Sequence, residues 1–120
     1  MLKFEEKSGG ANSGGLVTNP TACDLMLSEN RRVSRELANY ICNVTSKSLY
    51  LKKRGVKAAR FAVLKGAMMP AVLVEVGFLT NRREESRLKT SSFRDEVAGA
   101  ISRSILAYKN EYEKTNGFSN

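Results

Sequence analysis

A helical pattern of apolar residues runs through residues 24–51. Apolar side chains recur there at steps of three and four, which places them on one face of a helix: Val33, Leu37, Ile41 and Val44, with Tyr40 beside them. Ser28 or Asn30 is a candidate N-cap for the main segment, because either side chain can accept a hydrogen bond from the first turn. Gly55 follows the pattern and is a candidate C-terminal cap, since glycine readily adopts the left-handed conformation that ends many helices.

Two apolar runs that follow the helix are predicted to form strands. Residues 61–64 are Phe-Ala-Val-Leu, and residues 71–78 are apolar except for Glu75. The second run is typical of a strand buried on both faces, as in an α/β sheet with helices on each side. Residues 65–70, which end in a Met-Pro turn, separate the two runs. This connection is too short for a helical crossover, so the strands are expected to be antiparallel or not directly paired.

Two further helices are predicted toward the C-terminus. Thr80 or Asn81 can cap a short helix that ends at about Lys89. Ser92 followed by Asp95 opens a longer helix with a near capping box. The longer helix carries an apolar stripe in steps of four: Phe93, Val97, Ile101 and Ile105, extended by Leu106, Tyr108 and Tyr112.

The order of these elements is helix, strand, strand, short helix and long helix. Two strands are too few for an independent sheet, and the second strand has the composition of a central strand. The pattern therefore predicts an α/β fold in which this chain forms part of a larger sheet, with N-terminal strands missing. Residues 8–20 are rich in Gly and Ser and are predicted to be a flexible loop, whose backbone amides could alternatively cradle an anion.

The residue composition excludes several kinds of catalytic and metal-binding site. The chain contains no histidine, which excludes histidine general bases, His-activated nucleophiles and the usual imidazole metal sites. Cys23 and Cys42 lack metal-ligand spacing, so a structural or incidental role is favoured for both. No apolar run approaches the roughly 20 residues that span a bilayer, and the N-terminus has no stretch of signal-peptide type. We expect the chain to stay inside the cell or to depend on an export signal outside this sequence.

The net charge of +8 is concentrated in the middle of the chain. Residues 1–30 carry a balance of −2, residues 31–65 a balance of +9 and residues 66–120 a balance of +1. The middle block contains ten Lys or Arg and a single acid, Glu36. A solvated helix face with its loop accounts for such a block. The alternative is an anionic polymer partner, such as a cell-wall polymer, a membrane surface or nucleic acid.

Glu75 is the one residue with clear catalytic potential. An isolated carboxylate in an apolar strand is costly, so it must be paired, protonated, on a metal-facing surface or at a cleft. Open α/β sheets form their clefts at the carboxyl ends of strands, and Glu75 lies toward that end, just before Gly77. The alternative is a buried salt bridge from Glu75 to Arg60, Lys65 or another basic side chain. Asn81 is expected to hydrogen-bond to a loop backbone.

Two segments carry a resemblance to a known family. Residues 61–64 are Phe-Ala-Val-Leu, and residues 69–81 are Met-Pro-Ala-Val-Leu-Val-Glu-Val-Gly-Phe-Leu-Thr-Asn. Together they resemble the C-terminal signature of the zinc-dependent N-acetylmuramoyl-L-alanine amidases, the peptidoglycan hydrolases of bacteria, their phages and spores. The joint occurrence of Pro, Glu, Gly-Phe and Asn is specific. Flanking positions also fit the helices of this family, so the resemblance covers about residues 31–112.

The resemblance implies a mixed sheet flanked by helices, and a zinc ion held by two histidines and a glutamate nearer the N-terminus. It implies cleavage of the amide between N-acetylmuramic acid and L-alanine by a zinc-activated water. The glutamate in the position of Glu75 is then the general base. Because this chain has no histidine, none of its residues is assigned as a zinc or cofactor ligand, and the isolated chain is predicted to be inactive. The family implies action outside the cell or at the cell wall, in peptidoglycan catabolism, as an autolysin.

Three hypotheses about function follow. The first is the C-terminal portion of a zinc amidase, either truncated, made from an internal start, or completed by a missing N-terminal half or partner chain. The second is a non-enzymatic basic module that binds anionic wall polymers. The third, a nucleic-acid binder, is disfavoured because only Tyr50 lies among basic residues as a stacking platform would. Under the first hypothesis, residues 1–30 are a Gly-rich loop or variable insertion, residues 31–114 the C-terminal part of an amidase-like catalytic domain, and residues 115–120 a flexible tail.

Overall fold

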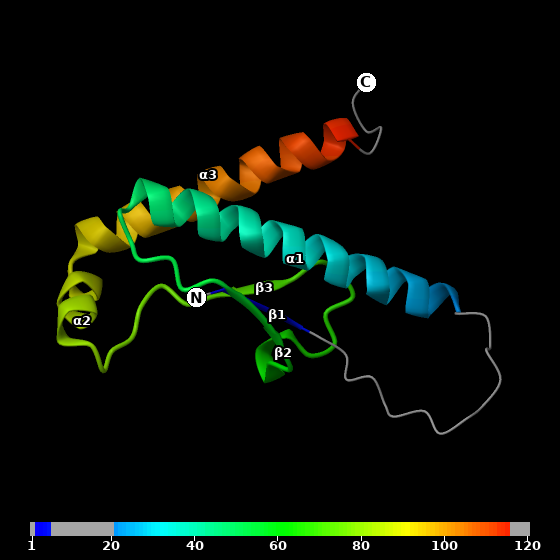
Figure 1. Ribbon diagram of the computed structural model, residues 1–120, viewed down its shortest axis with the longest axis horizontal. Coiled ribbons are helices and arrows are strands. Elements are labelled where there is room, and N and C mark those ends of the chain that lie inside the picture. The colour runs from blue at the N-terminus through cyan, green and yellow to red at the C-terminus, as the bar shows by residue number, and fades with distance from the viewer. Residues whose placement is uncertain (1, 6–20, 116–120) are drawn as a thin grey trace.

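The computed structural model describes residues 2–5 and 21–115 (Figure 1). The Gly-rich segment 8–20 and residues 116–120 of the predicted tail lie outside the described residues. The elements, in chain order, are β1 (Leu2–Glu5), α1 (Ala22–Ser48), β2 (Val56–Ala59), the short 3₁₀ helix η1 (Ala62–Leu64), β3 (Val72–Val74), α2 (Arg82–Lys89) and α3 (Ser91–Thr115).

The sheet of the described residues has the order β2-β1-β3. The central strand β1 pairs in parallel with β2 and antiparallel with β3. Leu2 of β1 lies opposite Val56 of β2 on one side and opposite Val74 of β3 on the other. The sheet is therefore mixed, as the resemblance implies. Strands β2 and β3 are separated by β1, so β3, which was predicted to be a central strand, lies at an edge of the described sheet. The pattern of the sequence did not reveal β1, because four residues are too few to show a period.

The strand predicted at residues 61–64 is wrong. Those residues form η1, and the strand precedes them, at Val56–Ala59. The β2 sequence Val-Lys-Ala-Ala is weak in strand-forming residues, and its side chains alternate between half-buried and exposed. Within η1, Leu64 is buried but Val63 is 73% exposed. The apolar run 61–64 therefore predicted a strand wrongly. Its side chains do not share one buried face.

Helix α1 lies between the strands and α3 and contacts all of them (Figure 1). The centre of the core is the α1 cluster Ala38, Ile41 and Cys42. Packed against this cluster are apolar side chains of β2, β3 and α3: Val56, Ala58, Val72, Val74 and Ile101. The opposite face of β2 carries Lys57 and Ala59, both exposed. The expected helices on both faces of the sheet are therefore not found in the described part of the chain, where α1 covers one face.

The ends of α1 differ from the predicted ones. Thr21, rather than Ser28 or Asn30, is the N-cap. Its side-chain oxygen accepts a hydrogen bond from the Asp24 N–H at 3.2 Å, and Asp24 Oδ2 accepts one from the Thr21 N–H at 3.3 Å. This capping box lies ahead of the apolar stripe, so periodicity alone placed the start of the helix too late. At the other end α1 stops at Ser48, and Gly55 lies in the following loop rather than at the cap.

The buried stripe of α3 is Phe93, Val97, Ala100 and Ser104. The first two were predicted, whereas Ile105 is 43% exposed and Leu106 is 58% exposed. An α-helix has about 3.6 residues per turn. Residues spaced strictly four apart are therefore rotated by roughly 40° around the helix at each step, and their side chains leave the buried face. The cap of α2 is confirmed, because Asn81 Oδ1 accepts hydrogen bonds from the N–H groups of Arg83 and Glu84.

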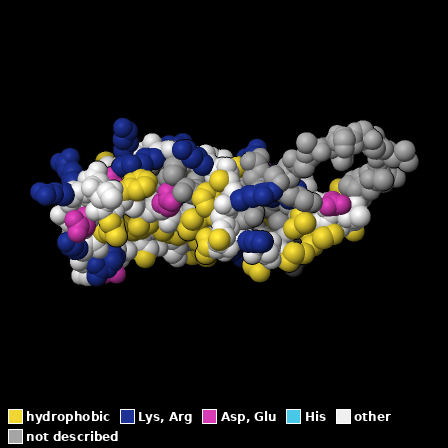
Figure 2. Space-filling view, turned by 90° about the horizontal axis from the view of Figure 1, so that it is seen from below, with side chains coloured by type: hydrophobic (Ala, Val, Ile, Leu, Met, Phe, Trp, Pro, Cys, Tyr) yellow, Lys and Arg dark blue, Asp and Glu magenta, His cyan; other side chains and the backbone are white. Residues whose placement is uncertain are grey.

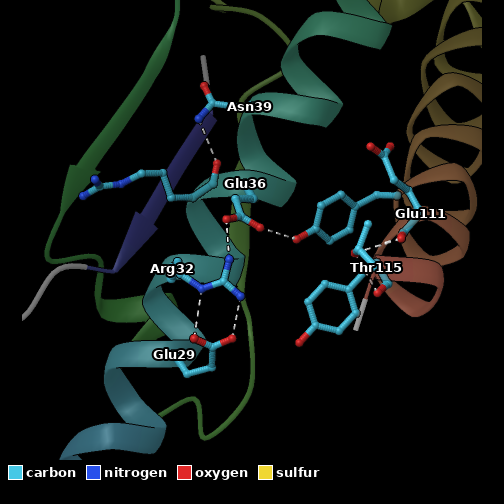
Figure 3. Close-up of polar contacts among 9 residues, drawn as sticks. Glu29, Arg32, Glu36, Asn39, Glu111 and Thr115 are labelled. Carbon is cyan, nitrogen blue, oxygen red and sulfur yellow. Dashed lines mark hydrogen bonds and ion pairs between the residues drawn. The ribbon is translucent and has the colours of Figure 1, made fainter. Parts of the chain in front are cut away.

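Polar contacts join α1 to the C-terminal half of α3 (Figure 3). Arg32 donates to Glu29 and to Glu36 along α1, and the Tyr108 hydroxyl of α3 donates to Glu36 at 3.2 Å. The Tyr108 ring also lies 5.8 Å from that of Tyr40. Burial, and then the negative charge of Glu36, raise the pKa of Tyr108 to about 12. The carboxylate of Glu36 thus anchors the two long helices to each other.

Candidate active-site cleft

Glu75 directly follows β3, at the carboxyl end of that strand. It is half-buried, with its Oε2 atom shielded from solvent. The residues around it, 74–78, form one wall of a cleft with a volume of about 270 Å³. The other walls come from the end of α1 and its following loop, from α2 and from α3. The structure therefore places the candidate base at a cleft, as the sequence predicted.

The chain beyond Glu75 is held against α2. A Cβ atom added to Gly77 would lie 3.2 Å from Leu88 Cδ1 and 3.3 Å from Glu84 Oε2, so only glycine fits without displacement. The N–H of Phe78 donates to Glu84 Oε2 at 2.8 Å. Side chains of α2 therefore pack closely against the backbone at Gly77. Asn81, expected to bond to a loop backbone, instead caps the backbone of α2.

Glu84 connects this wall to the loop before β2. It forms an ion pair with Arg54, whose guanidinium lies 4.7 Å from the centre of the Phe78 ring. These two charged residues are 30 positions apart, so neither spacing nor composition could pair them in advance. Together, Arg54, Phe78 and Glu84 fix the position of the peptide segment that begins at Glu75.

Basic side chains, the alternative partners proposed for Glu75, line two separate cavities. Arg60 and Lys65 line a different cavity of about 650 Å³, together with Phe61 and residues of α1. The cleft beside Glu75 is instead lined by four other basic side chains: Lys52, Arg54, Arg83 and Arg87. Figure 2 shows Lys and Arg side chains gathered at the end of the molecule that carries α2, next to a band of hydrophobic side chains. The basic side chains of residues 31–65 thus contribute to both cavities, Lys52 and Arg54 to the cleft beside Glu75 and Arg31, Arg60 and Lys65 to the other.

The residues of this chain do not fit a zinc site. Across the described residues 2–5 and 21–115, no group of three or more His, Cys, Asp or Glu side chains could hold a metal ion. The full sequence has no histidine. Cys42 is buried in the core and Cys23 is exposed at the start of α1, so the two thiols do not converge either.

The described helices include none that is both long enough and apolar enough to cross a membrane.

Comparisons with known proteins place these features in a family. Residues 7–107 match the model of the N-acetylmuramoyl-L-alanine amidase family, Amidase_3, and the chain belongs to this family. The resemblance drawn from the residues around Glu75 is thereby confirmed.

Individual relatives agree with this assignment. The chain is 37% identical over 100 residues to the amidase AmiC of Escherichia coli, covering 83% of this chain and 24% of the relative. It is 40% identical over 75 residues to the amidase LytC of Bacillus subtilis, covering 62% of this chain and 15% of the relative. A solved N-acetylmuramoyl-L-alanine amidase from Clostridium difficile superimposes with a TM-score of 0.63 at 28% identity, covering 89% of this chain and 54% of that one. The chain thus spans about a quarter or less of these two curated relatives.

Proposed function

We propose that this chain supplies the general-base part of a peptidoglycan amidase, with Glu75 as the base. The observation that carries the proposal is the position of this carboxylate, which directly follows a strand and lines a cleft. Open α/β folds place reacting groups at such strand ends. Family membership supports the substrate, the amide that joins N-acetylmuramic acid to L-alanine.

The chemistry assigned to Glu75 is a proton transfer in two steps. The carboxylate takes a proton from a water molecule, whose oxygen forms a bond to the carbonyl carbon of the amide. The carbon–nitrogen bond then breaks, and Glu75 returns the proton to the departing amine of L-alanine. A carboxylate held within reach of both groups accelerates such a reaction by about 100-fold to 10,000-fold. The segment fixed by Arg54 and Glu84 provides the required rigidity.

The remaining half of the site must come from outside these residues. The family resemblance implies zinc, and two histidines would hold it, but this chain has none. Within the described residues, β3 is paired on one side only, by β1. A strand added at its other edge would bring a histidine-bearing segment beside Glu75. We infer that a missing N-terminal half, or a partner chain, docks there, and that peptidoglycan is the substrate of the completed site.

A complementation experiment tests this proposal. The chain is incubated with purified peptidoglycan and zinc, alone and together with the part of the Clostridium difficile amidase that it does not cover. Release of free L-alanine amino groups is expected only from the combination. Release by the chain alone would overturn the assignment of an incomplete site. Failure of the combination, despite a demonstrated complex of the two parts, would overturn the proposed function.

A second function is favoured by the basic side chains that line the cleft. A non-enzymatic module that binds anionic wall polymers would use the same surface, with Glu75 in a structural role. Binding to cell walls that weakens with salt and survives the loss of Glu75, without any activity on complementation, would support it. DNA added as a competitor tests the nucleic-acid alternative. Action at the cell wall as an autolysin and the division at residue 114 remain parts of the first proposal, whereas a division at residue 30 would fall inside α1 (Ala22–Ser48).

A further inference from the structure

Tyr50 adopts an unusual conformation directly after α1. Its φ angle is 50°, in the left-handed region, and its side chain is 96% exposed. The N–H of Tyr50 donates to the Lys47 carbonyl, and the N–H of Leu51 donates to the Ser46 carbonyl at 3.0 Å. This is the bonding pattern of a Schellman motif, in which glycine usually occupies the left-handed position. A bulky ring is disfavoured there, and burial does not compensate for it, since the ring is exposed.

The position of this strained residue coincides with the candidate active site. Tyr50 lines the same cleft as Glu75, at the wall formed by the end of α1. Residues held in strained conformations concentrate at ligand-binding sites, where the surrounding structure keeps them in place. An exposed aromatic ring at the rim of a cleft offers a flat apolar face to a ligand.

Two of the four basic side chains of the cleft are available to a ligand. Arg54 is engaged by Glu84 and Phe78, and Arg87 lies 4.3 Å from the centre of the Phe93 ring. Lys52 and Arg83 also line the cleft, and neither forms a salt bridge within the described part of the chain. Lys52 is two residues from Tyr50 in the sequence, whereas Arg83 belongs to α2.

We propose that Tyr50, Lys52 and Arg83 form a subsite for a sugar ring that carries an acidic peptide. The sugar face with its C–H groups stacks on the Tyr50 ring, because such hydrogens are attracted to the negative face of an aromatic ring. Lys52 and Arg83 receive the carboxylates of the attached peptide. The inference rests on the proposed function, in which a muropeptide is the substrate, and assigns the residues that hold it beside Glu75.

Binding to the unmodified chain tests the subsite without any catalysis. The chain is titrated with N-acetylmuramoyl-L-alanyl-D-glutamate, with N-acetylglucosamine and with L-alanyl-D-glutamate, and amide shifts are followed by NMR. Tyr50→Gly is expected to weaken muropeptide binding by about threefold to tenfold and to leave dipeptide binding unchanged. The same variant is expected to raise Tm, because glycine relieves the backbone strain. A merely structural role would not move stability and affinity in opposite directions.

Matched variants separate the contribution of the Tyr50 ring to binding from those of the Lys52 and Arg83 charges. Tyr50→Phe keeps the ring and is expected to bind as the wild type does. Lys52→Gln and Arg83→Gln are each expected to weaken binding of the muropeptide and the dipeptide by about twofold to fivefold. Arg82→Gln removes a neighbouring charge that does not line the cleft and is expected to have no effect.

Several outcomes would overturn the subsite. They are the absence of muropeptide binding, wild-type affinity in Tyr50→Gly, and equal losses in Arg82→Gln and Arg83→Gln. If complementation yields activity but these titrations show no binding, the subsite is wrong and the proposed function stands. If the muropeptide binds as expected but a demonstrated complex of the two parts yields no activity, the proposed function is wrong and the subsite stands.

Discussion

Replacement of Gly77 by alanine tests how the segment beyond Glu75 is held. The added Cβ would lie 3.2 Å from Leu88 Cδ1 and 3.3 Å from Glu84 Oε2, whereas carbon atoms in good contact are about 3.5–4.0 Å apart. Leu88 or Glu84 must therefore move. Glu84 cannot move freely, because its carboxylate accepts the Phe78 N–H and pairs with Arg54.

The expected cost follows from two opposing effects. Overpacking a well-filled site costs about 1–3 kcal/mol. The φ angle of Gly77 lies outside the left-handed region, so alanine is compatible with the backbone and restricts the unfolded chain, which returns about 0.4–1 kcal/mol. We expect Gly77→Ala to lower the free energy of unfolding by about 1–2 kcal/mol.

Urea unfolding followed by circular dichroism measures this change, and Gly99→Ala is the matched control. Gly99 lies inside α3, where an added Cβ meets only the end of the flexible Arg103 side chain, at 3.1 Å. Alanine there is expected to stabilise the helix by about 0.5–1 kcal/mol. If Gly77→Ala proved as stable as the wild type while Gly99→Ala behaved as expected, the account of the packing between residues 77 and 84 would be refuted.

Two further predictions concern the long helices. Thr21→Ala removes the N-cap of α1 and is expected to cost about 1 kcal/mol in urea unfolding, and an unchanged midpoint would contradict the observed capping box. The pKa of Tyr108 is raised from 10.0 to about 12. Between these two pH values the Tyr108 hydroxyl stays protonated in the folded state and is ionised in the unfolded state. Its contribution to stability is complete below pH 10 and is lost as pH rises from 10 to 12. The stability difference between the wild type and Tyr108→Phe should shrink over that range, and a constant difference would contradict the shift.

The helices could be predicted from the sequence because their signals are local. The apolar period located α1 and α3 to within a few residues, and Asn81 was identified as the cap of α2. The strands could not be predicted equally well. β1 and β2 have four residues each, and they are stable only through pairing between distant parts of the chain. Their local sequences, Leu-Lys-Phe-Glu and Val-Lys-Ala-Ala, do not require extended structure.

The candidate site shows the same division between local and distant signals. Glu75 was identified because an acid is costly in an apolar strand, and this reason depends only on neighbouring residues. The ion pair of Arg54 with Glu84 required the folded chain, since its members are separated by 30 positions. Tyr50 was noted among basic residues, but its left-handed backbone and its place at the cleft became visible only in the structure.

The role of Glu75 as general base is the central claim, and a single substitution in the completed enzyme tests it most directly. Glu75→Gln preserves shape and removes the proton acceptor. With the histidine-bearing segment and zinc present, we expect kcat to fall by about 100-fold to 10,000-fold while KM changes little. Glu85→Gln, on α2 and outside the cleft, should keep wild-type kcat. A Glu75→Gln enzyme that retained wild-type kcat would contradict the account.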